Sequence, residues 1–341
     1  MNSEDETLER PLPINDERTQ HVRIRVRRTV PGRRLDTYLR ARYTNLSRTA
    51  IQRLIRQKTV RVNDKFVKAS AVLHAGDTIE LHLPDPEPPE VVPEDIPVDV
   101  LYEDEHIIAI NKQAGIICHP ARASQSGTIV NALAFYADKL SSGSAPYRPG
   151  IVHRLDKNTT GVMLVAKCDE AHWRLSQQFE RRTIQKTYLA VATGELALDG
   201  DTIDAPLGVH PVVREKFAVL VRDNKINIAR NAVTRYEVSE RFRGYTLVTL
   251  FPKTGRTHQL RVHMSHIGHP LVGDGMYGGK AISEKRITGE GSDEAFLKHQ
   301  ALHAWKIRFT HPITEREMEI QAPFHAELKR LVLLLRRARS V

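Results

Sequence analysis

A proline-rich, acidic segment, residues 84–97, most constrains what this chain can fold into. It holds six prolines in 14 residues, and proline lacks a backbone N–H and has a fixed φ, so the segment cannot continue a helix or a central strand. Segments of this kind act as stiff spacers. The 341 residues are therefore expected to form a small domain over residues 21–83 and a larger one over residues 98–341, after a disordered polar tail at residues 1–20.

The small domain and the linker carry opposite charge. Residues 33–68 hold eleven Arg or Lys against two Asp, nearly all of the formal net charge of +10, whereas residues 84–105 hold nine Asp or Glu and no Arg or Lys. A solvated basic face without a ligand is common, but charge concentrated in one small segment favours a polyanion, and nucleic acid is the first candidate. The expected nucleic-acid contacts in this domain are Arg34, Arg48, Arg53, Arg56, Lys58 and Arg61.

Local patterns predict an α+β fold for the small domain. Residues 22–26 alternate apolar and basic side chains, as a half-exposed strand does, and residues 34–39 are typical of a short helix. Ser47 can cap a second helix that has one apolar face. Two further strands are expected at residues 60–65 and 77–81.

Strands dominate the larger domain, with helices interspersed. The lack of strict alternation predicts an α+β fold, and a chain that is 40% apolar is ample for a packed core. The polar, glycine-containing residues 280–298 are expected to form a mobile loop. The expected strands are residues 106–111, 161–167, 187–193, 230–238 and 245–251, and the expected helices are residues 128–140, 169–182, 258–267 and a C-terminal one from residue 324.

Several protein classes are disfavoured. No apolar run approaches the roughly 20 residues that span a bilayer, and the acidic, polar N-terminus does not resemble a signal peptide. The two cysteines, Cys118 and Cys168, are too few for a disulfide framework or a four-cysteine zinc site. They are expected to be reduced thiols of a cytoplasmic protein.

The most informative chemistry lies in residues 153–161, which read HRLDKNTTG. Asp156, Arg154 and His153 crowd into four residues, directly before an apolar run, Val162–Ala166. Charged residues seldom crowd the mouth of a buried strand unless they are used. The alternative is a loop that caps a strand, with Asp156 forming a turn, and the local run does not decide between the two.

The run resembles the catalytic signature of the RluA-type pseudouridine synthases, and segments 107–120, 255–278 and 300–312 match the same family in the expected order. The resemblance covers residues 20–335. It implies a mixed, largely antiparallel sheet with flanking helices as the catalytic domain. In the RluD-like subgroup this domain follows a small α+β RNA-binding domain of the type first seen in a ribosomal protein, which the basic N-terminal pattern fits.

The reaction implied by the resemblance moves the glycosidic bond of uridine from a base nitrogen to carbon 5. No atoms enter or leave, so no cofactor is needed. The resemblance gives Asp156 the central role, either attacking or stabilising the anomeric carbon or abstracting a sugar proton. Arg261 is expected to keep that carboxylate ionised, and Tyr188 to stack on the target uracil.

The remaining predicted site residues contact RNA. Arg154 is expected to fill the space that the flipped uridine leaves, Arg256 to bind phosphate, and His153 to be structural or to touch phosphate. The signature departs from its commonest form at two positions: Asn158 stands where Asp is usual, and Thr160 where Ser is usual.

Three histidines, His263, His266 and His269, recur at a spacing that places them partly along one side of a helix. Gly268 and Pro270 are expected to end that helix before His269 can join it, and no cysteine lies nearby. Because zinc sites need three or four convergent ligands, no metal is expected.

The favoured interpretation is an RNA-uridine isomerase that acts on structured RNA, foremost large-subunit ribosomal RNA, with transfer RNA as the alternative. One rival is an RNA-binding or ribosome-assembly factor with an idle site, which the intact set Asp156, Tyr188 and Arg261 argues against. The other is a base-removing glycosidase, which would have to admit water. The expected partners are RNA and ribosomal-subunit precursors. The protein is expected to be a cytoplasmic monomer that does not bind a membrane.

Overall fold

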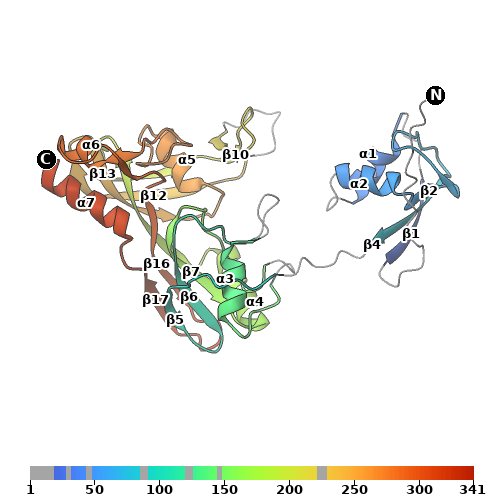
Figure 1. Ribbon diagram of the computed structural model, residues 1–341, viewed down its shortest axis with the longest axis horizontal. Helices are drawn as coiled ribbons and strands as arrows, with labels where there is room; N and C mark the ends of the chain where they lie inside the picture. Colours follow the sequence, from blue (N-terminus) through green and yellow to red (C-terminus); the bar gives the residue numbers. More distant parts are fainter. Residues whose placement is uncertain are drawn as a thin grey trace, which may run out of the picture. The chain divides into compact units, whose positions relative to one another are not determined.

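The computed structural model describes residues 19–27, 32–43, 48–84, 91–119, 126–143, 148–220 and 229–341. It divides into two compact units, Met1–Glu87 and Pro88–Val341, drawn in blue and in green to red in Figure 1. Each unit has its own hydrophobic core. No helix in the described ranges is long and apolar enough to cross a bilayer.

The N-terminal unit is a four-stranded antiparallel sheet with two helices. Leu35 and Leu39 of the first helix and Ile51 and Ile55 of the second share one buried core with Ile79 of the sheet. The expected strands and helices are confirmed, while Ser47 lies outside the described residues. In spatial order the strands are β1 (Thr19–Arg25), β4 (Thr78–Pro84), β2 (Val60–Val62) and β3 (Lys65–Phe66), and the helices are α1 (Leu35–Arg42) and α2 (Arg48–Arg56).

The C-terminal unit is built on a nine-stranded sheet. Its neighbouring strands pair antiparallel, except that β16 runs parallel to β7 where His303 lies opposite Thr160. The α+β class and the largely antiparallel sheet are confirmed. In spatial order the strands are β5 (Val100–Glu103), β6 (Ile107–Lys112), β7 (Thr160–Ala166), β16 (Leu302–Thr310), β8 (Gln185–Thr193), β13 (Tyr245–Pro252), β12 (Val233–Phe242) and β9 (Gly200–Asp204), and β17 (Glu317–Gln321) pairs with β16.

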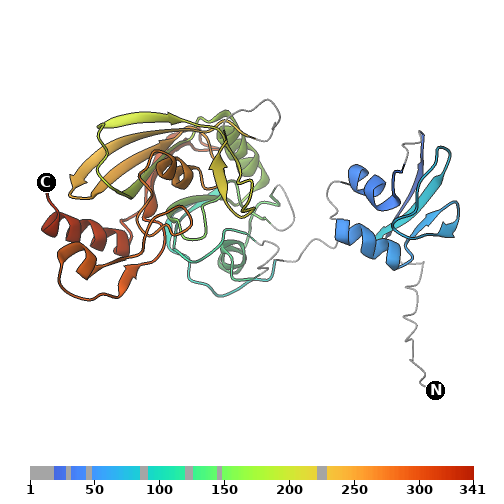
Figure 2. The same cartoon turned by 90° about the horizontal axis from the view of Figure 1, so that it is seen from above.

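Alternating side chains of the central strands are buried on both faces of this sheet. Ile108 of β6 and Tyr188 of β8 belong to the core that also holds α3 (Ile129–Tyr136) and α5 (Gln259–His266). Leu164 of β7 belongs to a separate core with α4 (Asp169–Arg181). A third core joins Val191 of β8 to α7 (Ala326–Ala338), the red helix in Figure 2. The strand that carries Tyr188 is thus held from both sides.

The prediction of a mobile loop over residues 280–298 is wrong. The segment forms β14 (Ile282–Ser283), α6 (Glu284–Thr288) and β15 (Ala295–Leu297). Three of its apolar residues, Ile282, Ile287 and Leu297, are each only 1% exposed and share a core with α7. The spacing of these three residues shows no helical or strand period, so only tertiary packing reveals the order.

Two further elements pack on the core of this unit. A hairpin of β10 (Leu207–Val209) and β11 (Phe217–Val219) contacts α5. Helix α3 is shorter than the range 128–140 that the sequence predicts: Thr128 and Asn131 form a capping box at its start, and it ends at Tyr136.

Candidate active site

The signature run lies in the loop that enters β7, and Gly161 shows why this sequence is needed there. Gly161 has φ 108°, and a Cβ at this position would lie 2.2 Å from the carbonyl oxygen of Ala304. Only glycine allows the parallel contact of β7 with β16. The neighbouring Thr160 hydroxyl lies 2.8 Å from Nδ1 of the buried His303, so the hydroxyl kept by this substitution of Thr for Ser is used.

A buried lysine holds the loop around Asp156. Lys112 is 1% exposed, and its Nζ donates to the carbonyl oxygens of Gln113 at 3.0 Å, Lys157 at 2.9 Å and Thr159 at 3.1 Å. Burial lowers the pKa of Lys112 to about 8. The carbonyls of Lys157 and Thr159 closely follow Asp156 in the chain, so the ammonium group fixes the backbone on which the carboxylate is mounted.

Two further contacts complete this support. The Leu155 backbone N–H donates to Sγ of Cys118 at 3.3 Å, and the Cys118 thiol donates to the Leu155 carbonyl at 3.2 Å. The Asn158 side-chain oxygen accepts a hydrogen bond from the Gly115 N–H at 3.2 Å. Asn therefore provides the acceptor that Asp would provide. Lys112 and Cys118 were not among the predicted site residues, although both lie in the upstream matched segment.

Asp156 is paired with Arg261. Oδ2 of Asp156 lies 3.3 Å from Nη1 of Arg261, and the two side chains are 17% and 7% exposed. Arg261 in turn donates from Nε and Nη2 to both carboxylate oxygens of Asp274, at 2.7 and 2.8 Å, and its guanidinium carbon lies 4.9 Å from the centre of the Tyr277 ring. Burial lowers the pKa of Arg261, but Asp274 and Asp156 raise it more, so it stays charged. The expected pairing of Asp156 with Arg261 is present.

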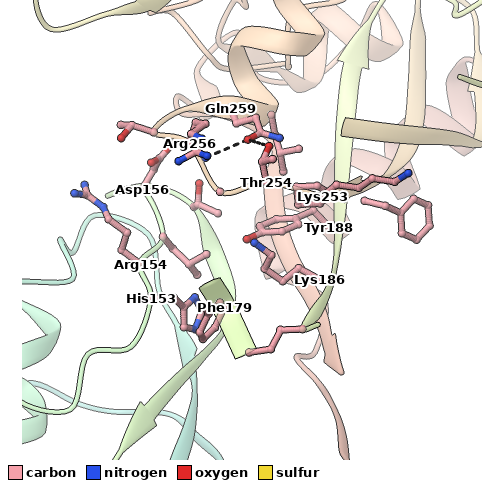
Figure 3. A pocket seen from close by; sticks show the side chains of 18 of the residues that line it. His153, Arg154, Asp156, Phe179, Lys186, Tyr188, Lys253, Thr254, Arg256 and Gln259 are labelled. Atoms are coloured by element: carbon pink, nitrogen blue, oxygen red, sulfur yellow. Dashed lines mark hydrogen bonds between the residues drawn. The ribbon is translucent and has the colours of Figure 1, made fainter. Parts of the chain in front are cut away.

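Gln259 shapes the turn that brings Arg261 here. Its buried side-chain oxygen accepts from the Thr254 hydroxyl at 2.6 Å and the Arg256 N–H at 3.1 Å, as the dashed lines in Figure 3 show. Its amide nitrogen donates to the Val233 carbonyl at 3.0 Å. These bonds tie the end of β13 to the start of α5. The first turn of α5 therefore places Arg261 at the cavity.

The third predicted catalytic residue, Tyr188, lines the same cavity as Asp156 and Arg261. It projects from β8 and is 9% exposed. Burial, reinforced by the charge of Asp156, raises the pKa of Tyr188, so the phenol stays protonated at neutral pH. The tertiary structure thus brings together three residues that are separated by up to 105 positions in the chain.

The cavity has a volume of about 1010 Å³, enough for a nucleotide with its neighbouring phosphates. Among the described residues that line it, Asp156 and Glu180 are the acidic ones. The cationic ones are Arg154, Arg182, Lys186, Arg235, Lys253, Arg256 and Arg261. Figure 3 shows several of these around the opening. A carboxylate in a cationic cleft suits chemistry on a sugar held within a polyanion.

Comparison with known proteins agrees with this geometry. Residues 106–266 match the family model described as RNA pseudouridylate synthase, and residues 33–79 match that of the S4 domain. The chain is 40% identical over 312 residues to the ribosomal large subunit pseudouridine synthase D of Escherichia coli strain K12, with 89% of this chain and 91% of that protein covered. The chain belongs to the RNA pseudouridine synthase family. It is an isomerase that acts on RNA.

Two other proteins are also similar to this chain. An uncharacterized RNA pseudouridine synthase of Bacillus subtilis is 40% identical over 304 residues, which cover 89% of this synthase and 94% of the relative. The solved structure of human RNA pseudouridylate synthase domain containing 4 superimposes with a TM-score of 0.54 at 24% identity, over 70% of this chain and 93% of that one. The second likeness shows a shared fold.

The predicted RNA contacts near Asp156 differ in their surroundings. Arg154 is exposed at the cavity, and no hydrogen bond or ion pair links it to another described residue of the synthase. Nε of Arg256 donates to the Asn231 carbonyl at 3.3 Å. Burial, together with Arg182 and Arg230, lowers the pKa of Arg256. A guanidinium beside two others is a position where a phosphate relieves repulsion.

His153 has a structural position in the synthase. Its Nε2 accepts a hydrogen bond from the Leu164 N–H at 2.9 Å, and its ring stacks on Phe179 with 4.6 Å between centroids. Burial, with a smaller effect of Lys186, lowers the pKa of His153 to about 3. The ring is neutral at physiological pH. Of its two predicted roles, the contacts of His153 favour the structural one.

The six predicted cations of the N-terminal unit also divide into groups. Arg34 and Arg48 lie 3.0 and 3.2 Å from the buried carboxylate of Asp36, and Arg34 above all lowers the pKa of that group. The guanidinium of Arg61 lies 4.6 Å from the centre of the Phe66 ring. The last three, Arg53, Arg56 and Lys58, are exposed.

The three histidines of the α5 region have separate surroundings. Helix α5 ends at His266. Both ring nitrogens of His263 are engaged, with the Thr234 hydroxyl at 2.9 Å and the Ala205 carbonyl at 3.0 Å. His269 contacts the Thr193 carbonyl at 3.0 Å. Within the described ranges, no three His, Cys, Asp or Glu side chains are grouped as metal ligands.

Proposed function

We propose that this synthase converts uridine to pseudouridine in large-subunit ribosomal RNA, with Asp156 as the group that acts on the ribose. The observation that carries this proposal is the contact of Asp156 with Arg261 inside a cationic cavity. The ribosomal target is inferred from the S4 domain and from relatives that are named large-subunit synthases. Those names lend no support to a transfer-RNA target or to an idle site.

Asp156 acts from a preorganised position. Its carboxylate either attacks the anomeric carbon or removes the hydrogen from the adjacent ribose carbon, and both routes require an oxygen held against the sugar. Arg261 is itself fixed by two hydrogen bonds to Asp274. Because the guanidinium cannot swing away, it orients Asp156 without a reorganisation cost during the reaction.

Tyr188 forms the wall for the base. Its raised pKa keeps the phenol neutral, so its ring stacks on the detached uracil while the hydroxyl remains a hydrogen-bond donor. A neutral ring lets the base turn from its nitrogen to carbon 5 without trapping it in an ion pair. The same wall keeps bulk water from the sugar, which separates an isomerase from a base-removing glycosidase.

The cations position the RNA. Arg154 fills the space of the flipped uridine, and Arg256 with its neighbours binds the flanking phosphates. The exposed Arg53, Arg56 and Lys58 of the N-terminal unit dock the folded RNA. On this proposal the synthase works as a monomer on ribosomal-subunit precursors in the cytoplasm, and light scattering of the purified protein tests the monomeric state.

The test is to map pseudouridines after purified protein is incubated with large-subunit ribosomal RNA or, separately, with transfer RNA. We expect product at one or a few positions of ribosomal RNA. Asp156→Asn should lose it completely and still bind RNA, because Asn is close in shape but cannot attack or carry charge. Asp138→Asn, at an exposed position, is the matched control. Product from the Asp156→Asn protein, or product in transfer RNA alone, contradicts the proposal.

A further inference from the structure

His258 faces Asp156 across a gap of defined size. Nε2 of His258 lies 4.0 Å from Oδ1 of Asp156, whereas Arg261 occupies the other carboxylate oxygen, Oδ2. A gap of 4.0 Å is too long for a direct hydrogen bond. One oxygen placed about 2.9 Å from the nitrogen and about 2.7 Å from the carboxylate spans it at an angle of about 90°, which a hydroxyl accepts. The gap is therefore a seat for a single oxygen atom.

The neighbours of His258 decide what its Nε2 offers to that seat. The Tyr277 hydroxyl accepts a hydrogen bond from the Phe217 N–H at 3.1 Å and lies 2.7 Å from Nδ1 of His258. Since this oxygen already accepts one hydrogen bond, we assign its own proton to Nδ1, and this assignment places the ring hydrogen on Nε2. Burial lowers the pKa of His258, so the neutral ring dominates. Nε2 thus offers a donor to an atom in the gap, and Oδ1 of Asp156 offers an acceptor.

The ring is also held mechanically. His258 has a left-handed backbone, φ 57° and ψ 17°, at the start of α5. Its ring packs edge-on against Phe217 at 5.8 Å and Tyr277 at 5.6 Å between centroids. Phe217 belongs to the β10–β11 hairpin, and Tyr277 also lies against Arg261. Tyr277 thus supports both neighbours of the Asp156 carboxylate.

The occupant must accept one hydrogen bond and donate another. A phosphate oxygen cannot donate, and its charge would repel Asp156. We propose that the seat binds the 2′-hydroxyl of the target uridine, which accepts from Nε2–H of His258 and donates to Oδ1 of Asp156. This inference rests on the proposed function, since it is the action of Asp156 at the anomeric carbon that brings the adjacent hydroxyl to the carboxylate. The 2′-hydroxyl is the group that distinguishes RNA from DNA, so His258 selects ribose at the target.

The test is a four-way comparison of wild type and His258→Asn on an RNA fragment with either uridine or 2′-deoxyuridine at the target. Asn tolerates the left-handed backbone and is too short to fill the role of the ring. In wild type, the deoxy target should lower the single-turnover rate about 10- to 100-fold, as expected when a hydrogen bond to a charged group is removed. In His258→Asn that penalty should shrink at least about threefold, the sign of a direct coupling.

A second variant, Tyr277→Phe, tests whether the effect of His258→Asn is only a folding defect. Tyr277→Phe keeps the ring on Arg261 and removes only the hydroxyl that fixes the tautomer, so it should also shrink the deoxy penalty. His266→Asn, at an exposed position of the same helix, should keep the full wild-type penalty. Equal penalties in wild type, His258→Asn and Tyr277→Phe overturn the inference and indicate that a water molecule fills the gap.

The two proposals fail in different ways. The wild-type rate on the all-ribose fragment tests the proposed function without reference to His258. The affinity of each enzyme for each RNA is measured as well, so the coupling can be determined even on RNA that is bound without turnover. An active wild type without coupling refutes the role of His258 alone.

Discussion

Replacing Lys112 by Met tests how the structure supports the Asp156 carboxylate, which we propose acts on the ribose. The ammonium of Lys112 holds three backbone carbonyls, of Gln113, Lys157 and Thr159, and two of them lie within three residues of Asp156. Met has a similar length and fills the space, but it donates no hydrogen bond. We therefore expect the loop to loosen while the core of the unit remains packed.

The magnitude follows from two opposing effects. Hydrogen bonds to a charged group contribute about 1.5–3 kcal/mol each, so three contribute about 4.5–9 kcal/mol. Burial opposes them by lowering the pKa of Lys112 from 10.5 to about 8, which corresponds to about 3.4 kcal/mol. The difference is about 1–6 kcal/mol, and we expect Lys112→Met to lower the free energy of unfolding by about 3 kcal/mol. The single-turnover rate should fall at least about tenfold with little change in RNA affinity, since a small misplacement of a reacting group is costly.

The same shift predicts a dependence on pH. Between pH 8 and 10.5 the unfolded chain keeps the Lys112 proton that the folded chain has released. Stability rises with pH wherever the unfolded state binds more protons. The stability of wild type relative to Lys112→Met should therefore increase as the pH is raised from about 8 to 10.

Urea denaturation followed by tryptophan fluorescence measures this effect. The two tryptophans, Trp173 in α4 and Trp305 in β16, both lie in the C-terminal unit, so the signal reports on that unit alone. Lys139→Met, at an exposed position, is the control and should change stability by less than about 0.5 kcal/mol. A similarly small change in Lys112→Met, with an unaltered rate, would refute the reasoning.

Three further expectations can be tested on the same protein. Gly161→Ala should prevent folding of the C-terminal unit, because its Cβ would lie 2.2 Å from the Ala304 carbonyl oxygen, whereas Gly275→Ala, with open space around it, should leave the unfolding midpoint unchanged. Since the pKa of His153 falls from 6.5 to about 3 on folding, only the unfolded state gains a proton there as the pH drops below 6.5; the stability of wild type relative to His153→Gln should therefore decrease by about 2 kcal/mol between pH 7 and 5. The last expectation concerns three exposed cations, Arg53, Arg56 and Lys58. Replacing them by Gln should reduce the slope of log affinity against log salt by about 0.7–0.9 for each phosphate that the protein no longer neutralises. An unchanged slope would exclude these residues from RNA docking.

Most of the architecture could be predicted from local pattern. Apolar runs such as Ile107–Ile110 and Val162–Ala166 are buried strands, and the amphipathic residues 169–182 form α4. These succeed because each element buries a face that its own residues define. The prediction of a mobile loop at residues 280–298 is wrong for the opposite reason. Three apolar side chains there, Ile282, Ile287 and Leu297, are held by packing against α7, which comes later in the chain.

The sequence by itself determined the family, and it predicted a division at a proline-rich segment and the residue types of the candidate site, because motifs and composition are local properties. Only the tertiary structure decided which groups meet. It joined Asp156 to Arg261 across 105 positions, placed Lys112 under the loop, and left a gap of 4.0 Å between His258 and Asp156. Such distances depend on how β7 and α5 pack against their neighbours, and no local pattern encodes the sum of those contacts.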